Sequence, residues 1–157
     1  MRKVVVTECV SLDGVMEEPR WTFKYWNDEI AKLKGEESSA SDALLLGRVT
    51  YQGFVAAAWP QSKAEGADYF NSVPKYVVPK TLEEPLEWNN STLIKDNTVQ
   101  EITNLKQQDG EDIAVHGSAT LVQTLMHHDL VGVMGQERNR DMLTLQRCVP
   151  RPLRTAS

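Results

Sequence analysis

Short apolar runs alternate with helical patterns through the first 131 residues, and this alternation constrains the fold most. The runs rich in β-branched and apolar residues predict strands at 3–12, 43–47, 75–78, 91–94 and 112–115. Helical spacing of apolar residues predicts helices at 27–34, 49–59, 99–108 and 118–128. Such alternation favours an α/β protein with a mainly parallel sheet and helices on both faces.

The bulk composition excludes several classes of protein. The chain has 157 residues, which suits one domain, and its net charge of -5 argues against a duplex nucleic-acid partner. No apolar run approaches the roughly 20 residues of a membrane helix, so we expect no membrane partner. Glu8 interrupts the apolar start and no cleavage site follows, which argues against a signal peptide. The two cysteines form no disulfide framework or metal motif, and we expect a cytoplasmic protein.

The residues that follow the strand at 43–47 are suited to hold a phosphate. Ligands of parallel sheets bind beyond the carboxyl ends of the strands, where Gly47, Arg48 and Thr50 stand. The glycine permits a close approach, the guanidinium fork fits a phosphate, and the hydroxyl adds a donor near a helix start. The alternative is an ordinary surface arginine after a turn.

A second candidate anion site follows the strand at 112–115. The chain turns at a glycine, a serine caps the next helix, and the free N–H groups of Gly117, Ser118, Ala119 and Thr120 would point beyond the sheet. A diphosphate is the natural guest of such a turn. The alternative is a capped helix without a ligand. Together the two sites have the phosphate layout of NADPH, although the sequence has no G-x-G-x-x-G or Walker motif.

Three motifs, in this order and spacing, carry a family resemblance. They are S-L-D-G at 11–14, L-x-G-R-x-T-Y at 45–51 and G-S-x-x-L at 117–121. They resemble the dihydrofolate reductase-like family, and most of all small proteins similar to the reductase domain of the bifunctional riboflavin-biosynthesis deaminase-reductase. The resemblance covers about residues 2 to 131. It implies a three-layer sandwich with a twisted, mainly parallel sheet and NADPH bound across its carboxyl edge.

The resemblance also implies roles for individual residues that contact the cofactor. Gly47, Arg48 and Thr50 match the segment that meets the 2'-phosphate of the adenosine. The pyrophosphate turn of the family matches Gly117, Ser118, Ala119 and Thr120. Thr81 is a weaker match, because Pro79 stands where the family often has a small hydroxyl residue. His116 and Gly117 stand where dihydrofolate reductase has a Gly-Gly pair.

Four residues match the substrate side of the family site. Asp13 and Gly14 match the loop beside the nicotinamide and the substrate, and Trp21 resembles a tryptophan that follows this loop. Asp13 is also the candidate proton donor, with a simple turn residue as the alternative. Asp28 could bind the substrate as a helix carboxylate, or act only as a favourable acid in the first helical turn.

The last 26 residues differ in composition from the rest. Residues 132–157 contain five arginines, no lysine and two acidic residues, whereas acidic residues dominate the preceding part. We interpret residues 1–131 as a reductase domain and 132–157 as an Arg-rich tail, disordered or out of frame, which a check of the reading frame would test. The family continues with two strands beside the first strand. Without them, the strand at 3–12 would be an exposed edge, and a homodimer could cover it.

These observations lead to three hypotheses about function. The first is an NADPH-dependent reductase of the riboflavin-biosynthesis type, which would transfer a hydride to a phosphoribosylamino-pyrimidinone. The second is a dihydrofolate reductase-like enzyme with another heterocyclic substrate. The third is a non-catalytic remnant that binds a nucleotide weakly or only self-associates. No metal is expected in any of them.

Overall fold

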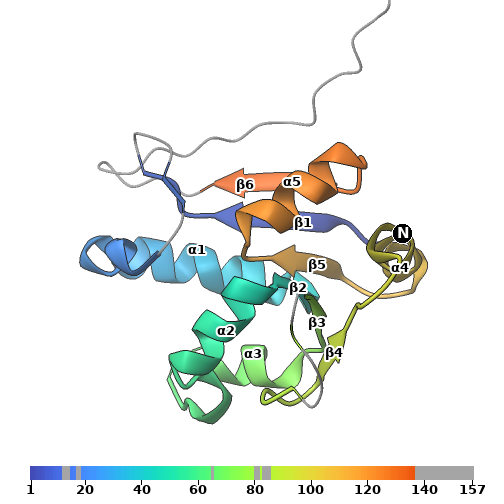
Figure 1. Cartoon of the computed structure of the whole chain (residues 1–157). Helices are drawn as coiled ribbons and strands as arrows, with labels where there is room; N and C mark the ends of the chain where they lie inside the picture. The colour runs from blue at the N-terminus through green and yellow to red at the C-terminus, as the bar shows by residue number, and fades with distance from the viewer. Residues whose placement is uncertain (12–14, 17–18, 65, 80–81, 83–85, 137–157) are drawn as a thin grey trace, which may run out of the picture.

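The computed structural model describes residues 1–11, 15–16, 19–64, 66–79, 82 and 86–136, with backbone only for 133–136. Six strands form one sheet in the order β4-β3-β2-β5-β1-β6, and every neighbouring pair is parallel (Figure 1). The strands are β1 Val4–Glu8, β2 Ser41–Gly47, β3 Lys75–Val78, β4 Ser91–Leu93, β5 Asp112–Val115 and β6 Val133–Gln136. The predicted parallel α/β sheet is therefore confirmed.

Helices lie on both faces of this sheet, as the alternation predicts. They are α1 Asp28–Ser39, α2 Arg48–Ala56, α3 Ala67–Ser72, α4 Thr98–Gln107 and α5 Ala119–His127. The short 3-10 helices η1 (Pro19–Tyr25) and η2 (Trp59–Gln61), together with α3, are additions to the predicted set. The arrowheads of β1, β5 and β6 point the same way in Figure 1, toward the side where α1 lies. This side is the carboxyl edge of the sheet.

The two faces of the sheet have separate apolar cores because successive side chains of a strand point to opposite faces. Val4 and Val6 of β1 pack with α4 and α5 on one face, which we call the α5 face. Leu44 and Leu46 of β2 pack with aromatic residues of and around α2 and α3 on the other face. Thr7 points to that second face, where it contacts α1. The structure thus has the predicted three layers.

Lys75 is fully buried in the core of the second face, among aromatic residues. Its ammonium donates to the carbonyls of Phe70 at 2.7 Å and Val73 at 2.8 Å, and lies 4.8 Å from the centre of the Trp88 ring. Burial lowers the pKa of Lys75 to about 8. The buried charge is therefore tolerated only because carbonyls and an aromatic face surround it.

The prediction that the first strand is an exposed edge is wrong. β6 pairs with β1 in parallel, from Val5 opposite Val133 to Glu8 opposite Gln136. The segment after residue 131 lacks the apolar alternation of a typical strand, but backbone pairing at the rim of a sheet does not require alternation. Among the described residues β6, and not β1, is therefore the edge strand, and the homodimer stays a prediction. Residues 137–157 lie outside the described part of the chain, and the interpretation of the tail stays a prediction there.

Helix α1 is longer than predicted. The sequence after residue 34 has little apolar surface, yet the helix continues to Ser39. Polar contacts stabilise this extension, because the Ser38 hydroxyl donates to the Lys34 carbonyl at 2.8 Å and Glu37 accepts from Thr7 of β1 at 2.9 Å. The start of the helix is as predicted, since the Asn27 side chain accepts from the Ile30 N–H at 2.9 Å.

Candidate functional site at the carboxyl edge

The two predicted phosphate segments lie against each other. β2 and β5 are neighbours in the sheet, and the Gly47 N–H donates to the Gly117 carbonyl at 3.1 Å. A Cβ on Gly47 would lie 2.9 Å from the backbone nitrogen of Ser118 and would also collide with its hydroxyl. A Cβ on Gly117 would lie 2.7 Å from the Thr50 hydroxyl. Both glycines are therefore required for the close contact between the segments.

Two helix N-termini meet at this point. α2 begins directly after Gly47 and α5 directly after Ser118, and neither of these N-cap residues makes a side-chain capping bond. The Gly117–Ser118 peptide bond is cis. The first N–H groups of both helices are without intrahelical acceptors, and each helix end carries a partial positive charge. This arrangement suits an anion such as a phosphate or a diphosphate. Ser118 lies at the predicted N-cap position, but the predicted capping by its side chain does not occur.

The remaining predicted cofactor residues surround these helix ends. Arg48 opens α2, and its guanidinium donates to the Gln52 side chain at 3.0 Å near the surface. Thr50 and Ala119 are half-buried, and Thr120 is exposed in the first turn of α5. The contact with Gln52 leaves both interpretations of Arg48 open, because a surface arginine could also turn toward a phosphate. Thr81 lies outside the described residues.

Glu8 joins the same site, and sequence reasoning missed it. Glu8 ends β1, and its Oε1 atom would lie 3.3 Å from a Cβ on Gly117. This oxygen is buried and has no hydrogen-bond partner among the described residues. Burial raises the pKa of Glu8 to about 7, although the positive charge of Lys34 opposes the shift. The signal in the sequence is an acidic residue inside a strand of β-branched residues, a pattern that by itself says nothing about which groups surround the carboxyl.

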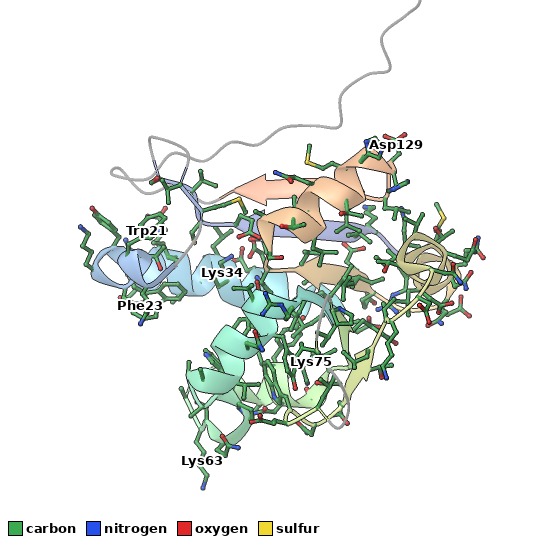
Figure 2. All side chains as sticks on the ribbon, viewed as in Figure 1. Trp21, Phe23, Lys34, Lys63, Lys75 and Asp129 are labelled. Carbon is green, nitrogen blue, oxygen red and sulfur yellow. The ribbon has the colours of Figure 1, made fainter. Side chains whose placement is uncertain are left out.

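A polar cluster lies on the opposite face of β1. The Lys34 ammonium donates to the Thr7 hydroxyl at 2.7 Å and to the Glu37 carboxylate at 3.0 Å. Figure 2 shows Lys34 where α1 passes the carboxyl edge of the sheet. Burial, and after it the charge of Lys34, lowers the pKa of His116 to about 3, so this imidazole is neutral at pH 7. The charge of Lys34 therefore acts on the pKa values of Glu8, at the end of β1, and of His116, which follows β5.

Of the four predicted substrate residues, the structure describes only Trp21 and Asp28. Asp13 and Gly14 lie outside the described residues. Trp21 lies on η1 (Figure 2), edge-on to Tyr25 at 6.5 Å, and its buried indole N–H has no partner in the described ranges. Asp28 is exposed in the first turn of α1, and both interpretations of this residue stay open.

Two other kinds of function find no support in the described ranges. There, no group of three or more His, Cys, Asp or Glu side chains is arranged to hold a metal ion. Within the same ranges, none of the helices has the length and apolar character that a bilayer crossing requires.

The parallel sheet with two helix N-termini at its carboxyl edge defines an α/β protein, and its fold is similar to that of dihydrofolate reductase. The match to a family model is more specific. The model of the RibD C-terminal domain matches residues 2–133, and the chain therefore belongs to that family.

Individual relatives agree with this family. The chain is 26% identical over 134 residues to the uncharacterized protein YyaP of Bacillus subtilis, across 83% of this chain and 70% of YyaP. A putative riboflavin biosynthesis protein from Shewanella has a similar structure (TM-score 0.61, 19% identity, 85% of this chain and 75% of that one). Dihydrofolate reductase from Enterococcus faecalis, solved with NADP(H), is also similar (TM-score 0.56, 14% identity, 85% and 68%). At these identities the structures support the fold alone.

Proposed function

We propose that this protein is an NADPH-dependent reductase of the riboflavin-biosynthesis type. One observation carries the proposal: Gly47 and Thr50 of one phosphate segment contact Gly117 and Ser118 of the other at two adjoining helix N-termini. Membership of the RibD C-terminal domain family, whose matched region includes both segments, supports the same conclusion. The cofactor would supply the hydride, and the protein would supply binding, orientation and electrostatics.

The residues present fit such a cofactor. The turn at Gly117 and Ser118, with the first N–H groups of α5 at Ala119 and Thr120, would hold the diphosphate. Arg48 and Thr50 at the start of α2 would hold the 2'-phosphate, for which a guanidinium is well suited. The absence of side chains at the two glycines allows the two groups of donors to adjoin.

The substrate is proposed from the family alone. We expect a phosphoribosylamino-pyrimidinone, with Asp13 as the proton donor and Gly14 and Trp21 beside the substrate. A dihydrofolate reductase-like enzyme with another heterocycle is the second candidate, and it rests on the resemblance of the three sequence motifs to that family. Asp28, which is exposed at the start of α1, would have to face the substrate in that case.

A fluorescence titration tests the proposed function. NADPH and NADH are added to the purified protein while tryptophan quenching is followed. We expect saturable NADPH binding, which the Arg48→Ala variant weakens by about 10- to 100-fold because a charged hydrogen bond is lost. NADH binding should change little in this variant, because NADH lacks the 2'-phosphate.

Lys63→Ala is the matched control, because Lys63 is a cation that points away from the body of the protein (Figure 2). Its loss should leave the binding of both nucleotides unchanged. An equal loss in both variants would indicate a general effect of charge and would contradict a specific role of Arg48. Absence of saturable binding by either nucleotide would overturn the reductase function, and binding without turnover would favour the non-catalytic remnant.

A further inference from the structure

Glu8 is the one carboxyl group, among the described residues, with a buried oxygen that lacks a hydrogen-bond partner. It ends the strand between β5 and β6, at the carboxyl edge. Its Oε1 atom would lie 3.3 Å from a Cβ on Gly117, so the carboxyl group adjoins the turn that precedes α5. A buried acceptor without a partner costs about 1–3 kcal/mol, and a position that retains such a group calls for an explanation.

The charged groups around Glu8 do not provide the missing partner. Side-chain alternation places Glu8 on the α5 face with Val4 and Val6, whereas Thr7 points to the opposite face. Lys34 of α1 acts on Glu8 through its charge, and among the described residues its ammonium donates to Thr7 and Glu37. The neutral His116 adds no charge from the side of β5.

An ionised carboxylate is also unfavourable at this position once an anion binds. The starts of α2 and α5 favour negative charge, but a diphosphate and a carboxylate in contact would repel each other. A neutral carboxyl group differs, because it carries an O–H donor that a phosphate oxygen can accept. Only the neutral form is therefore complementary to an anion at the turn.

We propose that Glu8 is a cofactor-binding residue whose neutral carboxyl group donates a hydrogen bond to the diphosphate at the Gly117–Ser118 turn, and whose ionised form weakens binding of that diphosphate. The inference rests on the proposed function, because NADPH brings the diphosphate. It adds a residue outside the three family motifs. It also makes cofactor binding depend on a single proton on the protein.

The titration of Glu8 should make the affinity for NADPH depend on pH. With a pKa of about 7, the neutral fraction of this group falls roughly 30-fold between pH 6 and pH 8.5. NADPH affinity should fall by up to that factor over the same range, and at pH 8.5 binding should take up nearly one proton per protein.

The test compares the wild-type protein with Glu8→Gln between pH 6 and pH 8.5. The amide of glutamine donates a hydrogen bond at every pH, so the variant should lack the fall in NADPH affinity toward pH 8.5 that Glu8 causes. Glu36→Gln is the matched control, because Glu36 is an exposed carboxylate of α1 whose partner in the described part of the chain is Lys32, at 3.9 Å. This control should keep the pH dependence of the wild-type protein. NADH shares the diphosphate and lacks the titrating 2'-phosphate, and it should show the same contrast.

Calorimetry of the wild-type protein provides a measurement that needs no variant. NADH binding at pH 8.5 in two buffers of different ionisation enthalpy should show uptake of nearly one proton, and at pH 6 almost none, because NADH lacks the titrating 2'-phosphate. The same pH dependence in wild-type and Glu8→Gln proteins, or no proton uptake, would overturn the role of Glu8 and leave the reductase function intact. Absence of NADPH binding at pH 6 by every variant would overturn the proposed function and this inference together.

Discussion

A Cβ on Gly47 would lie 2.9 Å from the backbone nitrogen of Ser118, closer than real Cβ atoms approach a neighbour. Gly47 is the last residue of β2, and Ser118 precedes α5. The contact therefore joins two segments that lie far apart in the sequence. Because backbone atoms are involved on both sides, a side chain at position 47 cannot be accommodated by a rotamer change alone.

Gly47→Ala should therefore destabilise the fold and weaken cofactor binding. Overpacking against backbone costs about 1–3 kcal/mol of unfolding free energy. Urea denaturation and the nucleotide titration measure the two effects. Gly53→Ala is the control, because a Cβ at position 53 would meet no other described part of the protein within 4 Å, and alanine should stabilise α2 by up to about 1 kcal/mol. Equal stability of the two variants would contradict the close contact at Gly47.

Gly117→Ala should be destabilising for two separable reasons. Gly117 has a φ of 102°, which L residues rarely adopt, and its Cβ would lie 2.7 Å from the Thr50 hydroxyl. The backbone strain alone should cost about 1–3 kcal/mol. Adding Thr50→Ala removes the colliding hydroxyl and should recover only part of the loss, as a double-mutant cycle would measure. Full recovery in the double variant would show that the backbone conformation contributes nothing.

Glu8→Gln should alter the pH dependence of stability even without a ligand. The pKa of Glu8 is raised from 4.5 to about 7, so between these values the folded protein holds a proton that the unfolded chain releases. The contribution of Glu8 to the unfolding free energy is thus full below pH 4.5 and is lost as the pH rises through 7. The variant should exceed the wild-type protein in stability by about 1–3 kcal/mol at pH 8, with little difference below pH 4.5. Denaturant unfolding at both pH values measures this, and a constant difference would contradict it.

Lys75→Met should remove a pH dependence of the opposite sign. The pKa of Lys75 is lowered from 10.5 to about 8, so between these values the unfolded chain binds a proton that the folded protein lacks. The wild-type protein should gain stability as the pH rises from 8 to 10.5, relative to the variant. Unfolding free energies of both proteins at pH 7 and pH 10 test this, because other titrating groups are common to the two. An unchanged difference would show that the buried ammonium keeps its ordinary pKa.

Much of the sheet could be predicted from local patterns. Each of the five predicted strands and four predicted helices exists. A short apolar run indicates a strand that is buried on both faces, and helical spacing of apolar residues indicates a helix that is buried on one face. The start of α1 could also be predicted from Asn27, since N-capping is a local interaction. The end of α1 could not, because polar contacts with Thr7 of a distant strand stabilise its last turns. β6 could not be predicted either, because its residues lack the apolar alternation of a strand and only the pairing with β1 defines it.

The sequence by itself determined the class of fold and two candidate segments for a phosphate, because strand and helix periods and glycine-containing turns are local properties. Only the tertiary structure decided that Gly47 and Thr50 contact the turn at Gly117 and Ser118. Strand order brings β2 next to β5, and no local pattern specifies that order. The environment of Glu8 was likewise decided by tertiary structure, because burial by distant segments, and not residue type, raises its pKa to about 7.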